Sequence, residues 1–304
     1  MKLIDILSDK TLNPSLIIGN GINRYNSSKA DKNNSWDKML LELWRKHSNS
    51  ESQLSTPTGI SLTEFYDALD LTKRSNEINL QYEFCELMSG WESKSHHLAI
   101  SSWAQSNGIP ILTTNFEETL SSSITQEIRH FDSITFTDFY PWGSYFSDHE
   151  VIDPATEFAI WHINGMQRYR RSIRLGLSHY MGSVERARRL IHKNNESTLF
   201  SGKNVNEWSG YKSWLHIIFN NDLIFIGLGL DTTEVFLRWL LIERAKYFSK
   251  FPERRKKAFF VHADQISLPV GQTLFLNSVG IQVVHESSYD ELYSLPWTSS
   301  KQRV

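Results

Sequence analysis

The sequence of 304 residues has a single cysteine, Cys85. One cysteine cannot form a disulfide within the chain, and it excludes the multi-cysteine clusters that hold structural zinc. Long apolar runs are also missing: the most apolar stretches, such as residues 223–226, are far shorter than the ~20 residues that span a bilayer. The N-terminus places Asp5 where a secretory signal needs an apolar run. We therefore expect a cytoplasmic protein with no membrane partner and no metal site.

The sequence also lacks a large excess of charge of either sign, because 34 acidic residues nearly balance 32 basic ones and the formal net charge is −2. Such a chain has no global field that attracts nucleic acid or an anionic membrane. Aromatic residues make up 12% of the chain, with ten tryptophans, which indicates a large core or a subunit interface. They are not interleaved with a basic groove, as a base-stacking surface requires. We expect no direct sequence-specific binding of nucleic acid.

Apolar runs without period-two alternation are typical of buried parallel strands. They occupy residues 15–19, 110–113, 158–163, 222–227, 258–262 and 281–284. Helical patterns lie between them, at residues 36–47, 62–71, 79–88, 96–107 and 233–248. This alternation predicts an α/β fold, a Rossmann-like, doubly wound, mostly parallel sheet with helices on both faces.

We expect these elements to form a single domain over residues 1–304. The segment of about 48–91 makes the connection between the first two strands longer than a single crossover helix requires. It therefore predicts a helical insertion beside the cleft. A second long segment, about 168–214, holds mostly helical patterns and is expected to form the other wall of the cleft.

Two predicted strands run into a Gly-x-Gly motif, at Gly19 and Gly21 and again at Gly227 and Gly229. Glycines at this position let backbone amides approach a phosphate, and the start of the next helix adds a favourable dipole. For the first motif, a tight turn without a ligand is an equally good interpretation. The second motif is followed by Asp231, which has the spacing of a helix cap with a glutamate three residues on.

Polar side chains follow the second predicted strand. Thr113, Thr114, Asn115 and Glu117 bring hydroxyl, amide and carboxylate groups to its carboxyl end, the edge where ligands bind in open α/β sheets. A helix cap explains the same pattern, with Thr114 or Asn115 as the cap and Glu117 or Glu118 completing a capping box. The pattern alone favours the cap slightly.

His162 and Asn164 end the third predicted strand. Residues two apart face the same side of an extended strand, so we expect the two side chains to lie together. A neutral imidazole in a cleft can take a proton from water or from a ribose hydroxyl near neutral pH. For a lone histidine, a buried and hydrogen-bonded ring is the commoner situation.

In this order along an α/β chain, the four motifs resemble the sirtuin-like (silent information regulator type) family. The resemblance is closest to its zinc-free bacterial branch found in anti-phage defence, and it covers about residues 16–248. The helix at residues 36–40 and the segment at 172–180 are also similar to that branch. The resemblance implies that NAD⁺ binds as the substrate, without zinc.

The resemblance also implies two groups of NAD⁺-binding residues. Those toward the phosphates and the nicotinamide end are Gly19, Asn20, Gly21, Asn23, Thr113 and Thr114. Those that border the adenosine half are Gly227, Gly229 and Asp231.

The implied catalytic residues are Asn115, Glu117 and His162. Asn115 would hold the nicotinamide ribose and the attacking water, Glu117 would take the place of the family's usual aspartate, and His162 would be the general base. The family often has His-Gly here, and an alignment on Gly165 puts Asn164 where that histidine belongs. In that alignment the base is missing, a loss that typically costs ~10²–10⁴ in rate.

The resemblance implies an NAD⁺ hydrolase that releases nicotinamide and ADP-ribose, as the effector of a bacterial anti-phage (abortive infection) system. An uncontrolled NAD⁺ hydrolase would kill its host, so we expect control by homo-oligomerisation or by a separately encoded sensor or ATPase partner. With Asn164 in the catalytic position, the alternative is a catalytically weak or inactive subunit that binds NAD⁺ or ADP-ribose. A second alternative is an ADP-ribosyl or deacyl transferase, although the four cysteines of the family's deacylases are absent.

Basic residues gather at 168–174, 186–189 and 254–257. Most such clusters are solvated faces or subunit contacts. A functional interpretation is that Arg168 or Arg174 folds back over the cleft and contacts the pyrophosphate of NAD⁺.

Overall fold

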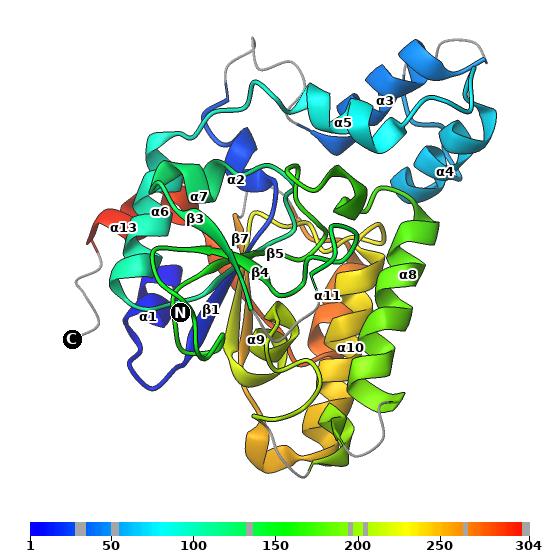
Figure 1. The fold of residues 1–304 in the computed structure, drawn as a ribbon. Coiled ribbons are helices and arrows are strands. Elements are labelled where there is room, and N and C mark those ends of the chain that lie inside the picture. The colour runs from blue at the N-terminus through cyan, green and yellow to red at the C-terminus, as the bar shows by residue number, and fades with distance from the viewer. Residues whose placement is uncertain are drawn as a thin grey trace.

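The computed structural model describes residues 1–27, 35–49, 55–131, 136–193, 197–202, 206–263 and 267–299. An eight-stranded sheet lies at its centre, and helices cover both faces (Figure 1). The strands are β1 (Pro14–Ile18), β2 (Ile111–Thr113), β3 (Glu127–His130), β4 (Ser144–Ser147), β5 (Ile160–His162), β6 (Asp222–Ile226), β7 (Ala258–Ala263) and β8 (Gln282–Glu286). The predicted α/β fold with a mostly parallel, Rossmann-like sheet is confirmed.

Across the sheet, the strands follow the order β3-β4-β5-β2-β1-β6-β7-β8. The strands β5, β2, β1, β6, β7 and β8 are parallel, and their order, 3-2-1-4-5-6 when numbered along the chain, is the Rossmann arrangement. Ile18 lies opposite Thr113 and Ile226, and Thr113 lies opposite His162. The carboxyl ends of four strands therefore stand side by side, at the point where the strand order reverses and where α/β proteins bind ligands.

An antiparallel hairpin of β3 and β4 extends the sheet beyond β5, and the sequence did not predict it. Arg129 pairs with Tyr145 within the hairpin, and Phe146 joins β4 to Ile160 of β5. The side chains of β3 are exposed or only partly buried, so no apolar run marks this strand in the sequence.

Side chains alternate across the strands and build two cores. Ile17, Leu112 and Phe225 face one core, whereas Leu16 and Ile226 face the other. The first core is covered by α8 (Leu177–Arg188), α9 (Trp214–Asn220), α10 (Val235–Lys250) and α11 (Val270–Ser278). The second is covered by α1 (Leu3–Ser8), α2 (Gly21–Arg24), α6 (Ser95–Ser106), α7 (Thr119–Ser123), α12 (Asp290–Tyr293) and α13 (Leu295–Ser299) (Figure 1).

A third core joins α3 (Trp36–His47), α4 (Leu62–Thr72) and α5 (Leu80–Leu87), which lie together at the top of Figure 1. The rings of Trp44 and Phe65 stack at a centroid distance of 4.6 Å in this core. Ser61 caps α4, because its side chain accepts a hydrogen bond from the backbone of Glu64 in a capping box. The predicted insertion at 48–91 thus contains α4 and α5, and these helices pack on α3, which precedes it in the chain.

The segment of about 168–214 contains η1 (Arg170–Ser172), α8, the π-helix η2 (Arg189–Lys193) and η4 (Leu199–Ser201). The short helix η5 (Pro252–Arg254) follows α10. In the part of the chain that the structure describes, no helix is both long enough and apolar enough to cross a bilayer.

Candidate functional site

A cavity of about 340 Å³ opens at the carboxyl ends of β1, β2, β5 and β6. The strand-end loops form one wall, and Trp36, Met39 and Phe84 of the helical group α3 to α5 form the other. The cavity brings together most of the predicted site residues: Asn20, Gly21, Thr114, Asn115, Glu117, Asn164, Gly227, Gly229 and Asp231. The remaining predicted residues, Gly19, Asn23, Thr113 and His162, are buried and are not part of its lining.

Glu117 is the most tightly held acid of this cavity, with only 4% of the residue exposed. Its Oε1 accepts hydrogen bonds from Asn23 Nδ2 at 2.8 Å, Thr119 Oγ1 at 3.0 Å and Asn115 Nδ2 at 3.1 Å. Burial raises the pKa of Glu117 to about 7, although these hydrogen bonds act in the opposite direction. The carboxyl group therefore changes its charge near neutral pH.

His97 on α6 positions the Asn23 amide, a role that the sequence pattern does not predict. The backbone N–H of Lys94 donates to His97 Nδ1 at 3.0 Å, so Nδ1 carries no proton and Nε2 is the donor. Nε2 lies 3.1 Å from Asn23 Oδ1, which turns Nδ2 of Asn23 toward Glu117. Burial lowers the pKa of His97 to about 3, so the ring stays neutral. No sequence signal distinguishes this histidine from others in amphipathic helices.

Asn115 is held by its backbone on both sides. Its N–H donates to Thr113 Oγ1 at 3.1 Å, and its carbonyl oxygen accepts a hydrogen bond from His162 Nδ1 at 2.8 Å. With Nδ2 directed at Glu117, the buried Oδ1 of Asn115 has no partner in the described part of the chain. This oxygen is free to accept a hydrogen bond from a ligand.

His162 supports the Asn115 loop. Its ring is 2% exposed, packs against Phe146 at 5.7 Å and does not line the cavity. Burial lowers the pKa of His162, which keeps the imidazole neutral. The strand β5 ends at His162 and the chain turns at residues 163–164, so alternation does not continue and only Asn164 reaches the cavity.

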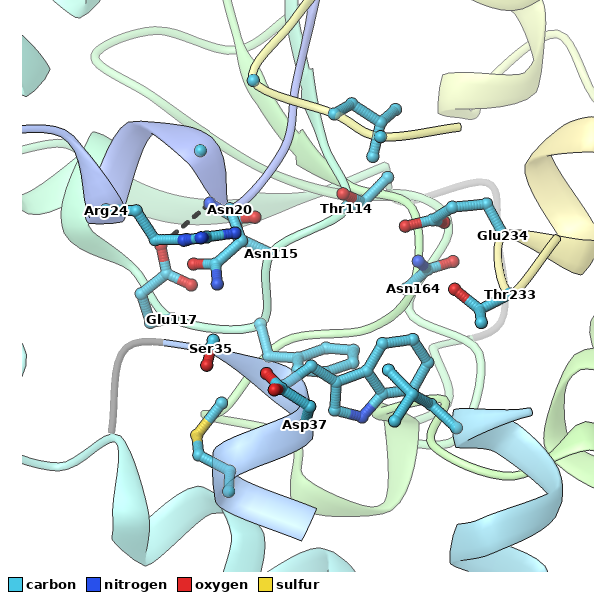
Figure 2. Close-up of a pocket in the computed structure, with 18 of the residues that line it drawn as sticks. Asn20, Arg24, Ser35, Asp37, Thr114, Asn115, Glu117, Asn164, Thr233 and Glu234 are labelled. Atoms are coloured by element: carbon cyan, nitrogen blue, oxygen red, sulfur yellow. Dashed lines mark hydrogen bonds between the residues drawn. The ribbon is translucent and has the colours of Figure 1, made fainter. Parts of the chain in front are cut away.

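Asn164 and Glu234 stand across the cavity from Asn115 and Glu117 (Figure 2). Asn164 is 2% exposed, and within the described ranges its Oδ1 and Oε2 of Glu234 have no hydrogen-bond partner. Burial and then the charge of Asp231 raise the pKa of Glu234 to about 7, whereas a hydrogen bond with Asn164 lowers it. The structure thus adds a second buried carboxyl group to the site.

Asp231 does not cap helix α10 as the sequence predicted. Helix α10 begins at Val235, two residues later than predicted, with Glu234 directly before it. Asp231 Oδ1 instead closes a short turn by accepting from the backbone N–H and the hydroxyl of Thr233. This turn leaves Glu234 directed at the cavity.

The two Gly-x-Gly motifs pack against each other. Gly19 N–H donates to the carbonyl of Ile226 and Gly21 N–H to that of Gly227, so both amides are already bonded. A Cβ at Gly21 would lie 2.7 Å from Gly227 Cα. Close packing of two loops therefore explains the glycines of the first motif.

The loop of the second motif offers free donors. Among the described residues, none accepts a hydrogen bond from the backbone N–H of Leu228, Gly229 or Leu230. Leu228 and Gly229 line the cavity, and Leu230 has a positive φ of 47°. Free amides in a loop at the end of a β-strand are suited to bind an anion.

The charges around the cavity are uneven. Among the residues that the structure describes, its charged lining consists of four acids, Asp37, Glu117, Asp231 and Glu234, and one base, Arg24. Such a site favours a ligand with a positively charged group near the acids. An anionic group fits best between Arg24 and the free amides of the second loop.

Two other arginines that the sequence suggested for a pyrophosphate do not line this cavity. Arg168 forms an ion pair with Glu118 at 2.9 Å. Arg174 is buried, donates to the carbonyl of Phe139 and stacks on the rings of Phe139 and Tyr140. Both side chains stabilise the surrounding loops in the structure.

Fold and site together define an α/β protein of Rossmann topology with a polar, acid-rich cavity at its switch point. Within the described ranges, no group of histidine, cysteine, aspartate and glutamate side chains could hold a metal ion. Comparison with protein-family models and with curated protein sequences finds no match to this chain.

Replacing Glu117 with glutamine is expected to change how stability depends on pH. In the folded protein the pKa of Glu117 is raised from 4.5 to about 7, so its contribution to stability is complete below 4.5 and is lost as pH rises through 7. Glutamine keeps an acceptor oxygen and does not ionise. Relative to the wild type, Glu117→Gln should therefore gain about 2 kcal/mol of unfolding free energy between pH 5.5 and 8.5.

Urea unfolding at the two pH values measures this difference. An equal free-energy difference between variant and wild type at both values would contradict the raised pKa of Glu117.

Proposed function

We propose that this protein cleaves the bond between ribose and nicotinamide in NAD⁺ and releases nicotinamide and ADP-ribose. The observation that carries the proposal is the buried carboxyl group of Glu117, which is held beside Asn115 in the switch-point cavity. The cavity volume of about 340 Å³ is also within the usual range for small-molecule sites.

The chemistry needs few groups. Nicotinamide leaves as a neutral molecule from a cationic precursor, so positive charge develops on the ribose in an oxocarbenium-like transition state. An ionised Glu117, with Glu234 across the cavity, would stabilise that charge. Asn115 Oδ1 and Asn164 Oδ1 have no partner among the described residues and would accept hydrogen bonds from ribose hydroxyls.

The proposed step balances with water as the nucleophile. The water oxygen bonds to the ribose carbon, the electron pair of the broken C–N bond goes to the pyridine nitrogen, and one proton is released. Glu117 is suited to accept this proton near neutral pH. Arg24 and the amides of residues 228–230 would bind the pyrophosphate.

A second candidate function is a subunit that binds NAD⁺ or ADP-ribose with little or no turnover. The specific observation in its favour is that Asn164, and not His162, lines the cavity. A role as an anti-phage effector and control by self-assembly or a separately encoded partner are further parts of the proposal, and they rest on the sequence resemblance. The cytoplasmic location expected from the sequence is part of the proposal as well. A transferase activity would require an acceptor and a product attached to it.

The two positions at the end of β5 should respond differently to substitution. Asn164→Ala is expected to lower kcat/KM for nicotinamide release by about 10- to 100-fold, because a buried hydrogen bond to substrate is lost. His162→Asn keeps a donor for the Asn115 carbonyl but cannot act as a base, and we expect it to retain turnover within about tenfold.

Nicotinamide and ADP-ribose would be measured by chromatography after incubation with NAD⁺, with the protein alone and with the product of a neighbouring gene. If His162→Asn lowered kcat/KM for nicotinamide release by ~10²–10⁴-fold, His162 would be the general base after all. Binding without turnover in every assembly would establish the second candidate and reject hydrolysis.

A further inference from the structure

A second cavity, about 660 Å³ in volume, lies at the opposite edge of the sheet, at the amino ends of β7 and β8. Helix α10 contributes Arg244 and Phe248 to it, and the end of α11 contributes Asn277. Among the described residues, all the charged side chains that line this cavity are basic: Arg244, Arg255, Lys256 and Lys257. We name it the basic cavity.

Arg244 is the fixed positive charge of the basic cavity, with only 3% of the residue exposed. Its guanidinium donates to the backbone carbonyls of Ile218 at 2.8 Å, Asn221 at 3.1 Å and Lys257 at 3.0 Å. Within the described ranges, it forms no ion pair with a carboxylate. A buried charge that is only hydrogen-bonded is costly, and an anion nearby reduces that cost.

The neighbouring carboxylate of Asp222 is hydrogen-bonded to two backbone N–H groups and not to Arg244. Its Oδ1 accepts from the backbone N–H of Lys257 at 2.6 Å, and its Oδ2 accepts from that of Asn13 at 2.8 Å. Burial lowers the pKa of Arg244 to about 9, with Asp222 raising it and Arg255 lowering it further. The guanidinium therefore remains charged at neutral pH, with a second cation close by.

The other positive charges of the basic cavity are less buried than Arg244, and Arg255 donates a hydrogen bond to the carbonyl of Phe248 at 3.5 Å. In the described part of the chain, the side chains of Arg255, Lys256 and Lys257 form no ion pair, whereas the adjacent Arg254 is bonded to Tyr247 and to the carbonyl of Gly202. Arg255 and Lys257 are exposed and can reach over the opening. Long basic side chains around a fixed guanidinium are a common arrangement for phosphate groups.

The remaining lining suits the organic part of such a ligand. Ser249, Asn277 and Gln282 provide hydroxyl and amide groups, and Phe248 and Val279 provide apolar surface. The volume lies within the range of about 300–1,000 Å³ that small-molecule sites occupy. A compact hollow fits a small phosphorylated molecule better than a strand of nucleic acid, which needs an extended groove.

We propose that the basic cavity is a binding site for a small organic phosphate with at least two phosphate groups, such as a nucleoside diphosphate or triphosphate. In the described part of the lining, four positive charges without an acid match the two to four negative charges of such a ligand. The site is separate from the acid-rich cavity and does not depend on the function proposed for that cavity.

The test measures binding of ADP and of inorganic pyrophosphate by calorimetry at low salt. The variant Arg255→Ser/Lys257→Ser changes two exposed side chains and removes one long hydrogen bond, from Arg255 to the carbonyl of Phe248, so we expect it to keep the fold, which circular dichroism checks. Its control, Arg188→Ser/Arg189→Ser, makes the same change of net charge on exposed residues that line neither cavity. We expect the first variant to weaken binding of both probes by about tenfold or more, and the control to leave it within about twofold.

Three outcomes would overturn the proposal. They are no binding of either probe to the wild type, the same effect in both variants (equal weakening or none), and binding of single-stranded oligonucleotides without binding of ADP or pyrophosphate. Because the readout is binding and not turnover, an inactive protein can still pass this test, and an active hydrolase can fail it.

Discussion

Glu117→Gln is expected to slow nicotinamide release from NAD⁺ by about 10²–10⁴-fold while the protein stays folded. Glutamine keeps the length of the side chain and an oxygen that can accept from Asn23, Asn115 and Thr119. It lacks the negative charge that would stabilise the ribosyl cation and the site that would accept the proton. Steady-state kinetics with chromatographic detection, together with circular dichroism, measure both parts of the expectation.

The pH profile makes the same test more specific. Because burial raises the pKa of Glu117 to about 7, wild-type activity should increase as pH rises through 7. The increase should be smaller in Glu117→Gln, where Glu234 is the remaining carboxyl group that ionises near this pH in the described part of the cavity. The matched control is Glu118→Gln, at a neighbouring glutamate that forms an ion pair with Arg168 and does not line the cavity. A Glu117→Gln variant with more than a tenth of wild-type activity would exclude Glu117 as the catalytic carboxylate.

Gly165→Ala is expected to have the largest effect on stability, a loss of about 3 kcal/mol or more. Gly165 has φ of +94°, and a Cβ there would lie 2.2 Å from the carbonyl oxygen of Ser172. The contact cannot relax easily, because Arg174 N–H donates to the carbonyl of Asn164 and Ser172 Oγ bonds to the backbone of Met166. Both strain and crowding therefore act on the loop that presents Asn164.

Gly271→Ala provides the control, since Gly271 lies in α11 and a Cβ there meets nothing within 4 Å. Alanine in a helix is favoured over glycine by up to about 1 kcal/mol, so this variant should be neutral or more stable. Chemical denaturation of the two variants and the wild type compares the effects. If Gly165→Ala were as stable as Gly271→Ala, the close approach of residues 165 and 172 would be wrong.

The parallel strands could be predicted from the sequence because both of their faces are buried. Strands such as β1 and β6 are buried along their whole length, which produces continuous apolar runs that end at the motifs. The hairpin could not be predicted in this way, since β3 is largely polar and partly exposed and β4 begins and ends with serine. The two strands owe their conformation to pairing with each other and, at Phe146, to the contact of β4 with β5.

The meeting of the motifs at one edge also follows from the sequence, because parallel strands of one sheet share the direction of their carboxyl ends. Which side chains face the cavity does not follow. The turn after His162 separates it from Asn164, and the short turn at Asp231 directs Glu234 inward. His97 was not predicted, since its role depends on a contact between residues 74 positions apart.

Helix α10 also affects how charge is distributed over the molecule. It starts next to Asp231 and Glu234 of the acid-rich cavity and extends to Arg244 and the basic cavity. Its own dipole, positive at the first end and negative at the other, favours the charges at both ends. The protein is thus polarised along α10 even though its formal net charge is only −2. An anion that diffuses nearby is drawn to one end and a cation to the other, and two copies attract when unlike ends meet, at distances that salt limits to about 8 Å.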